Sequence, residues 1–273
     1  QRLDIGMKYV GEIKLNAIQA ADGAARSLRP VASGMKNIEV NLSAVPRCQV
    51  SGAYSEAAIA DINANSLVLL HQLISLGTAT VRPGKEDQWH QLAEKIKTND
   101  IAGFRAQLSE VVELKNTGKN LVIMGDLLSG PTHNSWFALE IINAMHEQRQ
   151  TFSITLSHHD AQFIEYYLAN KDRAPGEDFA TAGDSWIFRE EPDASLNMLN
   201  NSLNDSPARR KEFQSMANNF LSHVAIVNCS HDKQTLYSSG VINDKMLSDM
   251  LTETGIHPDE QKNMNIQAKV NVI

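Results

Sequence analysis

The chain has 273 residues, a formal net charge of −7 and a hydrophobic content of 42%. This length allows one large α/β domain, and the hydrophobic content excludes an intrinsically disordered chain. The net acidity argues against a nucleic-acid partner, because phosphate backbones are bound by clustered Lys and Arg side chains. No apolar run is long enough to span a membrane, and the two cysteines, Cys48 and Cys229, lack the spacing of a zinc motif. We therefore expect a soluble protein of a reducing compartment.

The first part of the chain has no sustained periodicity. A strand-like run at 8–10 is followed by an Ala-rich helical stretch at 15–25 and then by a Pro-containing segment. We expect residues 1–55 to form an N-terminal extension that packs on the core. The main domain is expected to cover residues 56–273.

Strand-like and helical patterns alternate from residue 56 onward. Short apolar runs at 57–60, 120–124 and 152–156 have the length of strands, and helical patterns follow them. Residues 86–114 have the pattern of one or two amphipathic helices. Continuous apolar runs suit strands that are buried on both faces of a sheet, and their alternation with helices predicts an α/β fold.

The C-terminal part begins with a segment rich in Pro, Asp, Asn and Ser, which predicts a surface insertion over 172–208. A helix is expected at 209–221. The apolar runs at 224–227 and 235–237 flank a turn-like stretch and predict a β-hairpin. A last helix is expected at 243–254.

Polar side chains follow three of the predicted strands, at the point where each strand ends. In open α/β sheets the carboxyl ends of the strands border the crevice where ligands bind. Carboxylates and imidazoles gathered there can hold divalent metals, which polarise a phosphoryl oxygen and lower the pKa of a bound water. These strand-end residues are Asp61, Asn63, Asp126, His158, His159 and Asp160.

The order of these groups resembles the motif order of the calcineurin-like metallophosphoesterases, and most closely that of their Ser/Thr phosphoprotein phosphatase (PPP) branch. Asp61-Ile62-Asn63 resembles the family's Asp-x-His, Gly125-Asp126 its Gly-Asp-x-x-Asp, and His158-His159-Asp160 its Gly-Asn-His-Asp/Glu. The pair Ala64-Asn65 is similar to a variant in phosphatase-like effectors secreted by intracellular bacterial pathogens. The resemblance extends over about residues 56 to 250 and implies central β-sheets flanked by helices, an α+β sandwich.

The resemblance also implies a metal site. Asp61 takes the place of the first metal ligand, and Asp126 that of the carboxylate that bridges two metals. Asn63 and His158 stand at two further ligand positions. The metals implied are Mn²⁺, Fe or Zn²⁺.

The catalytic positions of the family are partly present. His159 takes the place of the general acid that protonates the leaving oxygen, and Asp160 that of the residue that orients it. His133, in the loop after the second strand end, is a candidate to replace a missing phosphate-binding group.

Several positions depart from the family pattern. Asn63 stands in place of a ligating His, His158 in place of a ligating Asn, and Ser239 in place of the hairpin His. Ser129 and Gly130 stand in place of an Asp and of the Arg that clamps the phosphate. Removing one preorganised charge-stabilising group typically costs about 2.7–4 kcal/mol in the transition state. We therefore expect metals to be weakly bound or absent and ordinary phosphatase activity to be lost.

Two functions follow from the resemblance. The first is a partner-binding pseudoenzyme with a phosphatase-like fold, such as a bacterial effector translocated into the host cytoplasm. The alternative is an active metal-dependent phosphoprotein phosphatase with a reshaped one- or two-metal site. The partner is a protein in the first case and a phosphoprotein substrate in the second.

Simpler interpretations of the same residues stay open. Gly125-Asp126 has the composition of an ordinary turn, and Asp160 is a candidate N-cap for a helix that begins at Ala161. His223 and His231 flank the predicted hairpin and are candidates for its missing ligand. The strand-end residues could also belong to an interaction domain in which their resemblance to a metal site is coincidental.

Overall fold

The computed structural model describes residues 41–42, 44–50, 54–130, 133–174, 177–179, 194–230, 235–239, 244–264 and 268–269. The predicted strand at 8–10 and helix at 15–25 lie outside this part of the chain. Within the expected N-terminal extension, Leu42 and Val45 pack against the main hydrophobic core. Among the described residues, no helix is both long and apolar enough to cross a membrane.

A four-stranded parallel sheet forms the centre of the molecule. Its strands are β1 (Glu56–Ile59), β4 (Asn120–Ile123), β5 (Phe152–Thr155) and β6 (Val224–Ala225), in the order β1-β4-β5-β6. The first three are the apolar runs that the sequence predicts as strands. The α/β fold class is therefore confirmed.

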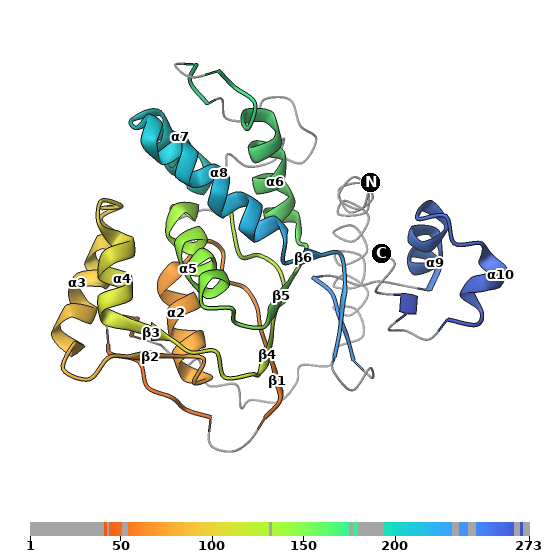
Figure 1. Cartoon of the computed structure of the whole chain (residues 1–273), viewed down its shortest axis with the longest axis horizontal. Helices are drawn as coiled ribbons and strands as arrows, with labels where there is room; N and C mark the ends of the chain where they lie inside the picture. Colours follow the sequence, from red (N-terminus) through yellow and green to blue (C-terminus); the bar gives the residue numbers. More distant parts are fainter. Residues whose placement is uncertain are drawn as a thin grey trace, which may run out of the picture.

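The helices that follow these strands begin at polar capping residues. Asn65 caps α2 (Ser66–Ser75), Asn134 caps α5 (Ser135–Glu147), and Ser157 caps α6 (His158–Asn170). In each case the side-chain oxygen accepts a hydrogen bond from a backbone N–H of the first turn, which that turn otherwise leaves without a partner. Figure 1 shows α2 and α5 on one side of the sheet, and the hairpin and the C-terminal helices on the other.

The region 86–114 contains more than helices. It forms α3 (Glu86–Lys97), α4 (Phe104–Val111) and a short strand, β3 (Val112–Leu114), which pairs with β2 (Ala79–Val81) in an antiparallel ribbon. The prediction of helix to the end of this region is wrong for its last three residues. The β-branched Val112 favours extended backbone at the start of this stretch, and the partner strand supplies the hydrogen bonds.

The expected surface insertion contains a core helix. Residues 194–204 form α7 (Ala194–Asn204), which packs against α5 and α8 (Pro207–Leu221). Three leucines at helical spacing are buried in this contact, so this part of the segment contributes to the core. They are Leu196, Leu199 and Leu203.

The hairpin starts later than predicted. Val224 and Ala225 pair with β5 in the central sheet, and the hairpin consists of β7 (Asn228–Cys229) and β8 (Leu236–Tyr237). The first half of the run 224–227 belongs to the sheet because Ile154 and Leu156 donate backbone hydrogen bonds to residues 223 and 225. The hairpin is fixed to the sheet by the side-chain hydrogen bond from Asn228 to Thr155.

The C-terminal helices are α9 (Asp244–Glu253) and α10 (Pro258–Gln261), and a small second hydrophobic core lies in this part of the molecule. The helix predicted at 243–254 is confirmed as α9. This second core joins the end of the sheet to α9. Its buried members are Ile226, Val227, Met246, Leu247, Met250 and Leu251.

Candidate functional site

The carboxyl ends of β1, β4 and β5 are joined by backbone and side-chain hydrogen bonds. Asn63 N–H donates to the carbonyl oxygen of Asp126 at 2.5 Å, and Ala64 N–H donates to that of Leu127 at 3.1 Å. Asp126 N–H donates to Ser157 Oγ at 2.8 Å. The three segments that end these strands therefore meet, as the sequence predicts for strand ends of a parallel sheet.

The loops at this edge contain unusual backbone conformations. Asp61, Asn63, Ala64, Asp126 and Ser129 have φ values between 50° and 66°. Residues with side chains rarely adopt this left-handed region, and such strain gathers at functional sites. The described residues contain two other non-glycine positions with positive φ, Asn99 and Arg149.

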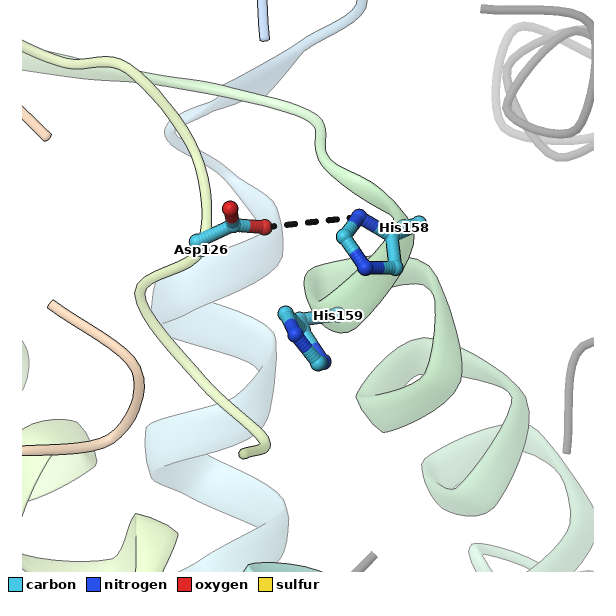
Figure 2. Close-up of side chains that lie close together, drawn as sticks. All are labelled: Asp126, His158 and His159. Carbon is cyan, nitrogen blue, oxygen red and sulfur yellow. Dashed lines mark ion pairs between the residues drawn. The ribbon is translucent and has the colours of Figure 1, made fainter. Parts of the chain in front are cut away.

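Three side chains with metal-binding groups meet at this edge. Ligand atoms of Asp126, His158 and His159 all lie within 4.8 Å of one another. Figure 2 shows the Asp126 carboxylate facing the ring of His158, with Oδ1 and Nδ1 3.6 Å apart. The two histidine rings, from the first turn of α6, lie 4.1 Å apart between centroids. One carboxylate and two imidazoles suit a cation such as Mn²⁺, Fe²⁺ or Zn²⁺.

The carboxylate of Asp126 has an unused oxygen. Oδ1 is buried and has no hydrogen-bond partner among the described residues. A buried carboxylate oxygen without a partner is unfavourable, because its desolvation is not offset by a hydrogen bond. A cation bound between Asp126 and the histidines would satisfy this oxygen, so these residues fit a divalent metal.

The Asp160 carboxylate is hydrogen-bonded to the loop that carries Asp126 and to Ser157. Its carboxylate is fully buried; Oδ1 accepts from the backbone N–H groups of Leu127 and Leu128, and Oδ2 from the Ser157 hydroxyl. Burial raises the pKa of Asp160 to about 6, against the opposing effect of the hydrogen bonds from Ser157 and Leu128. The carboxylate thus joins α6 to the Asp126 loop.

His159 is held by another residue. Its Nδ1 lies 3.4 Å from Gln162 Oε1, to which the Ser129 hydroxyl also donates at 3.2 Å. Both carboxylate oxygens of Asp160 accept hydrogen bonds from other groups, the loop amides and the Ser157 hydroxyl. The role of Asp160 in orienting His159 stays a prediction, and the structure adds the contact of His159 with Gln162.

Comparisons with known proteins identify the family of the chain. Residues 120–273 match the family model for the WipA-like phosphatase domain, over more than half of the chain. The chain belongs to the WipA-like phosphatase-domain family. A solved structure, the phosphatase domain from the Legionella effector WipB, matches with a TM-score of 0.59 and 17% sequence identity. That match covers 81% of this chain and 80% of the other, and at this identity it shows a shared fold. A comparison with curated proteins finds no match.

Two predicted ligands of this WipA-like domain are less well placed than Asp126. Asp61 is exposed, and its carboxylate is not part of the group formed by Asp126, His158 and His159 among the described residues. Asn63 is half-buried, and its backbone N–H holds the Asp126 loop. Their roles as metal ligands stay predictions.

Two glycines show how tightly the loops pack. A Cβ added to Gly125 would lie 2.7 Å from Ser157 Cβ and 2.9 Å from Ser239 Oγ, so Ser239 lies at the site, where the resemblance places the hairpin ligand. A Cβ added to Gly130 would lie 2.9 Å from the carbonyl oxygen of Asn63. This backbone arrangement leaves no room for a phosphate-clamping side chain at residue 130.

The other histidine candidates lie elsewhere. His133 is half-buried, its pKa is lowered by burial, and it is not part of the three-residue group. His223 precedes β6, at the opposite end of the sheet, where its Nε2 lies 2.9 Å from His146 Nδ1. His231 lies outside the described residues. The role of His133 in substrate binding stays a prediction.

Sequence reasoning missed two residues of this site, Ser157 and Gln162. Ser157 is the N-cap of α6, and its Oγ accepts from Asp160 N–H at 3.1 Å, so the predicted cap at Asp160 is wrong. A Ser between a strand and a helical pattern is a recognisable cap signal. Gln162 follows His159 by three residues, a spacing that places two side chains on the same helix face.

Proposed function

We propose that this chain is a phosphatase-like effector domain that binds a phosphorylated protein through one divalent metal, with little or no turnover. Family membership supports the phosphatase-like part of this proposal. The likeness to an effector of Legionella supports the effector part. The order of the strand-end motifs supports kinship with the calcineurin-like metallophosphoesterases and their phosphoprotein phosphatase branch.

Asp126, His158 and His159 would hold the metal. A divalent cation bound there supplies positive charge that attracts and polarises a phosphoryl oxygen. A carboxylate with two imidazoles suits Mn²⁺, Fe²⁺ or Zn²⁺. The buried Oδ1 of Asp126, which has no hydrogen bond among the described residues and faces His158, is the single observation that carries this assignment.

The proposal of weak turnover rests on what surrounds the metal ligands. The Asp61 carboxylate stands outside the three-residue group, and Ser239, which lies beside Gly125, stands where the family resemblance expects an imidazole. The crowding at Gly130 excludes an arginine clamp, whose bidentate geometry other residues do not reproduce. Loss of a single transition-state donor costs about 2.7–4 kcal/mol, so several such losses would leave phosphate binding with slow chemistry.

An active one-metal phosphatase is the second candidate. It is favoured by the contact of His159 Nδ1 with Gln162, because that contact can fix the tautomer of a general acid. In this case Asp126 and His158 would hold the metal, with Asp61 or Asn63 as a further ligand. His159 would then protonate the leaving oxygen.

One experiment separates these functions. Binding of a phosphoserine peptide and its hydrolysis are measured with and without Mn²⁺, in the wild type and in Asp126→Asn. The proposed function predicts Mn²⁺-dependent binding, without measurable hydrolysis, that is lost in the variant. Hydrolysis that is lost in the variant would establish the active phosphatase instead. Absence of both binding and hydrolysis would reject both.

The effector role is tested separately. A fusion of the full chain to a reporter that is active only in host cytoplasm is expressed in a bacterium with a translocation system. Signal in host cells supports an effector. Absence of signal beside a translocated control protein would reject it.

A further inference from the structure

The geometry points to Asp160 as the positioning residue of the metal site. We propose that its carboxylate fixes the loop that carries Asp126 against the helix turn that carries His158 and His159. This role rests on the proposed metal site but differs from ligand binding. It also differs from the general-acid partnership with His159 that the sequence resemblance implies.

The contacts form a continuous chain from helix to loop. Asp160 Oδ1 accepts from Leu127 N–H at 3.2 Å and from Leu128 N–H at 2.9 Å. Oδ2 accepts from the Ser157 hydroxyl at 2.6 Å, and Ser157 Oγ in turn accepts from Asp126 N–H at 2.8 Å. Three successive backbone amides of the loop are therefore held, directly or through one hydroxyl, by the first turn of α6.

The loop needs such a partner because of its backbone conformation. Asp126 and Ser129 both have left-handed φ values, of 50° and 66°, which are unfavourable for residues with side chains. This conformation persists only if the surroundings over-determine it. The fully buried carboxylate of Asp160 accepts from two consecutive amides at once, and a charge-assisted hydrogen bond is about twice as strong as a neutral one.

The consequence for the site is direct. The loop's position sets the 3.6 Å separation between Asp126 Oδ1 and His158 Nδ1, and the histidines belong to the turn that Asp160 anchors. Without the Asp160 carboxylate, the amides of Leu127 and Leu128 would need other partners and the loop could leave its left-handed conformation. The ligand atoms would then separate, and metal affinity would fall without the loss of any ligand.

The test compares two buried carboxylates in the full chain. Asp160→Ala and Asp160→Asn are made, and Glu140→Ala and Glu140→Gln serve as matched controls. Glu140 is also buried, with 3% exposure, but it is held by Arg105 Nε at 2.6 Å and is not part of the metal-binding group. Mn²⁺ affinity is measured by titration calorimetry well below each variant's melting temperature. Amide exchange of Leu127 and Leu128 is measured in parallel.

We expect Asp160→Ala to weaken Mn²⁺ binding by about 10–100-fold, the range for outer-shell partners of metal ligands. Asp160→Asn is expected to fall between this variant and the wild type, because an amide oxygen still accepts from the two amides but carries no charge. Exchange at Leu127 and Leu128 should rise in both variants. The Glu140 variants should lose stability and keep the wild-type Mn²⁺ affinity.

Two results would overturn the positioning role: unchanged Mn²⁺ affinity in Asp160→Asn and Asp160→Ala, or an equal loss of affinity in Glu140→Ala. If Asp160→Ala does not fold, the test rests on Asp160→Asn alone. Unchanged Mn²⁺ affinity in that variant would then overturn the positioning role. A wild-type chain that binds no Mn²⁺ would overturn the proposed function itself. Failure of the positioning role is therefore distinguishable from failure of the metal site.

Discussion

Each end of the parallel sheet carries a pair of half-buried histidines, and the two pairs differ in their partners. At the amino end, His146 Nδ1 and His223 Nε2 lie 2.9 Å apart, and His223 Nδ1 lies 3.3 Å from the carbonyl oxygen of Phe152. The His223 ring also stacks on Phe152, at 3.9 Å between centroids. At the carboxyl end, His158 and His159 face Asp126, whose buried Oδ1 accepts no hydrogen bond.

This difference separates a structural pair from a candidate site. The amino-end imidazoles have a ring-nitrogen contact with each other, and His223 stacks on Phe152, as expected of groups that stabilise a fold. The carboxyl-end imidazoles lie in the first turn of α6, beside the carboxylate of a loop that contains left-handed residues. Residue type and burial alone do not distinguish the two pairs; the partners of the ring nitrogens and of the neighbouring carboxylate do.

Removal of the Asp126 charge should have the largest effect on the carboxyl-end pair. In Asp126→Asn we expect Mn²⁺ affinity to fall by at least about 100-fold, beyond the range for outer-shell residues, because a ligand is lost. The free energy of unfolding should stay within about 1 kcal/mol of the wild type, since Oδ1 makes no hydrogen bond. Calorimetric titration and urea unfolding measure the two quantities. Wild-type affinity in this variant would remove Asp126 from the metal site.

A side chain at Gly130 should test how far the carboxyl end depends on its backbone. Gly130 has a φ of 150°, and an added Cβ would meet the carbonyl oxygen of Asn63. We expect Gly130→Ala to lower the free energy of unfolding by about 1–3 kcal/mol. The variant should also weaken Mn²⁺ binding, because the two loops must separate.

The matched control for this prediction is Gly84→Ala. Gly84 has a φ of 78°, but an added Cβ would meet nothing within 4 Å. A loss of about 1–2 kcal/mol, without an effect on Mn²⁺ binding, is expected from its left-handed backbone alone. Equal effects of both variants on Mn²⁺ binding would show that the contact between the loops is unimportant.

An alanine substitution in each histidine pair sharpens the comparison further. His158→Ala should weaken Mn²⁺ binding by at least about tenfold with little change in stability. His223→Ala should leave Mn²⁺ binding unchanged and lower the free energy of unfolding by about 1–3 kcal/mol, because it leaves polar partners unsatisfied. The opposite pattern, with stability lost in the first variant and metal lost in the second, would reverse the assignment of the two ends.

The smallest expected effect is a pH dependence at the amino end. Burial, and then the neighbouring His146, lower the pKa of His223 in the folded state. The unfolded chain therefore binds more protons, and the contribution of His223 to stability is lost as the pH falls below about 6.5. Urea unfolding at several pH values should show a steeper loss of stability toward acid in the wild type than in His223→Gln. Equal slopes would contradict this assignment.

The sequence predicted the parts of the fold that depend on local pattern. Apolar runs identified β1, β4 and β5, and the polar residues after them meet at one edge, because parallel strands bring their carboxyl ends together. The helix α7 escaped prediction, since its leucines lie in a polar segment. The register of the hairpin was not predicted, because Val224 and Ala225 pair with β5. That contact joins residues distant in sequence.

The hydrogen bonds among the residues at this edge of the sheet were not predicted. The resemblance implies that Asp160 orients His159. It does not indicate that the buried Asp160 carboxylate accepts hydrogen bonds from the amides of Leu127 and Leu128. Such a contact depends on the left-handed course of the Asp126 loop, which no motif encodes. The neighbour of His159, Gln162, was missed for a similar reason: it completes a network with a buried serine from another loop.

The most direct test of this account is the number of Mn²⁺ ions bound per chain, determined by metal analysis and titration of the wild type. The account predicts one ion, bound at the edge where Asp126, His158 and His159 meet. That ion should be displaced by neither His146→Ala nor His223→Ala. Two tightly bound ions would contradict the one-metal site, and the absence of any bound ion would contradict the metal site altogether.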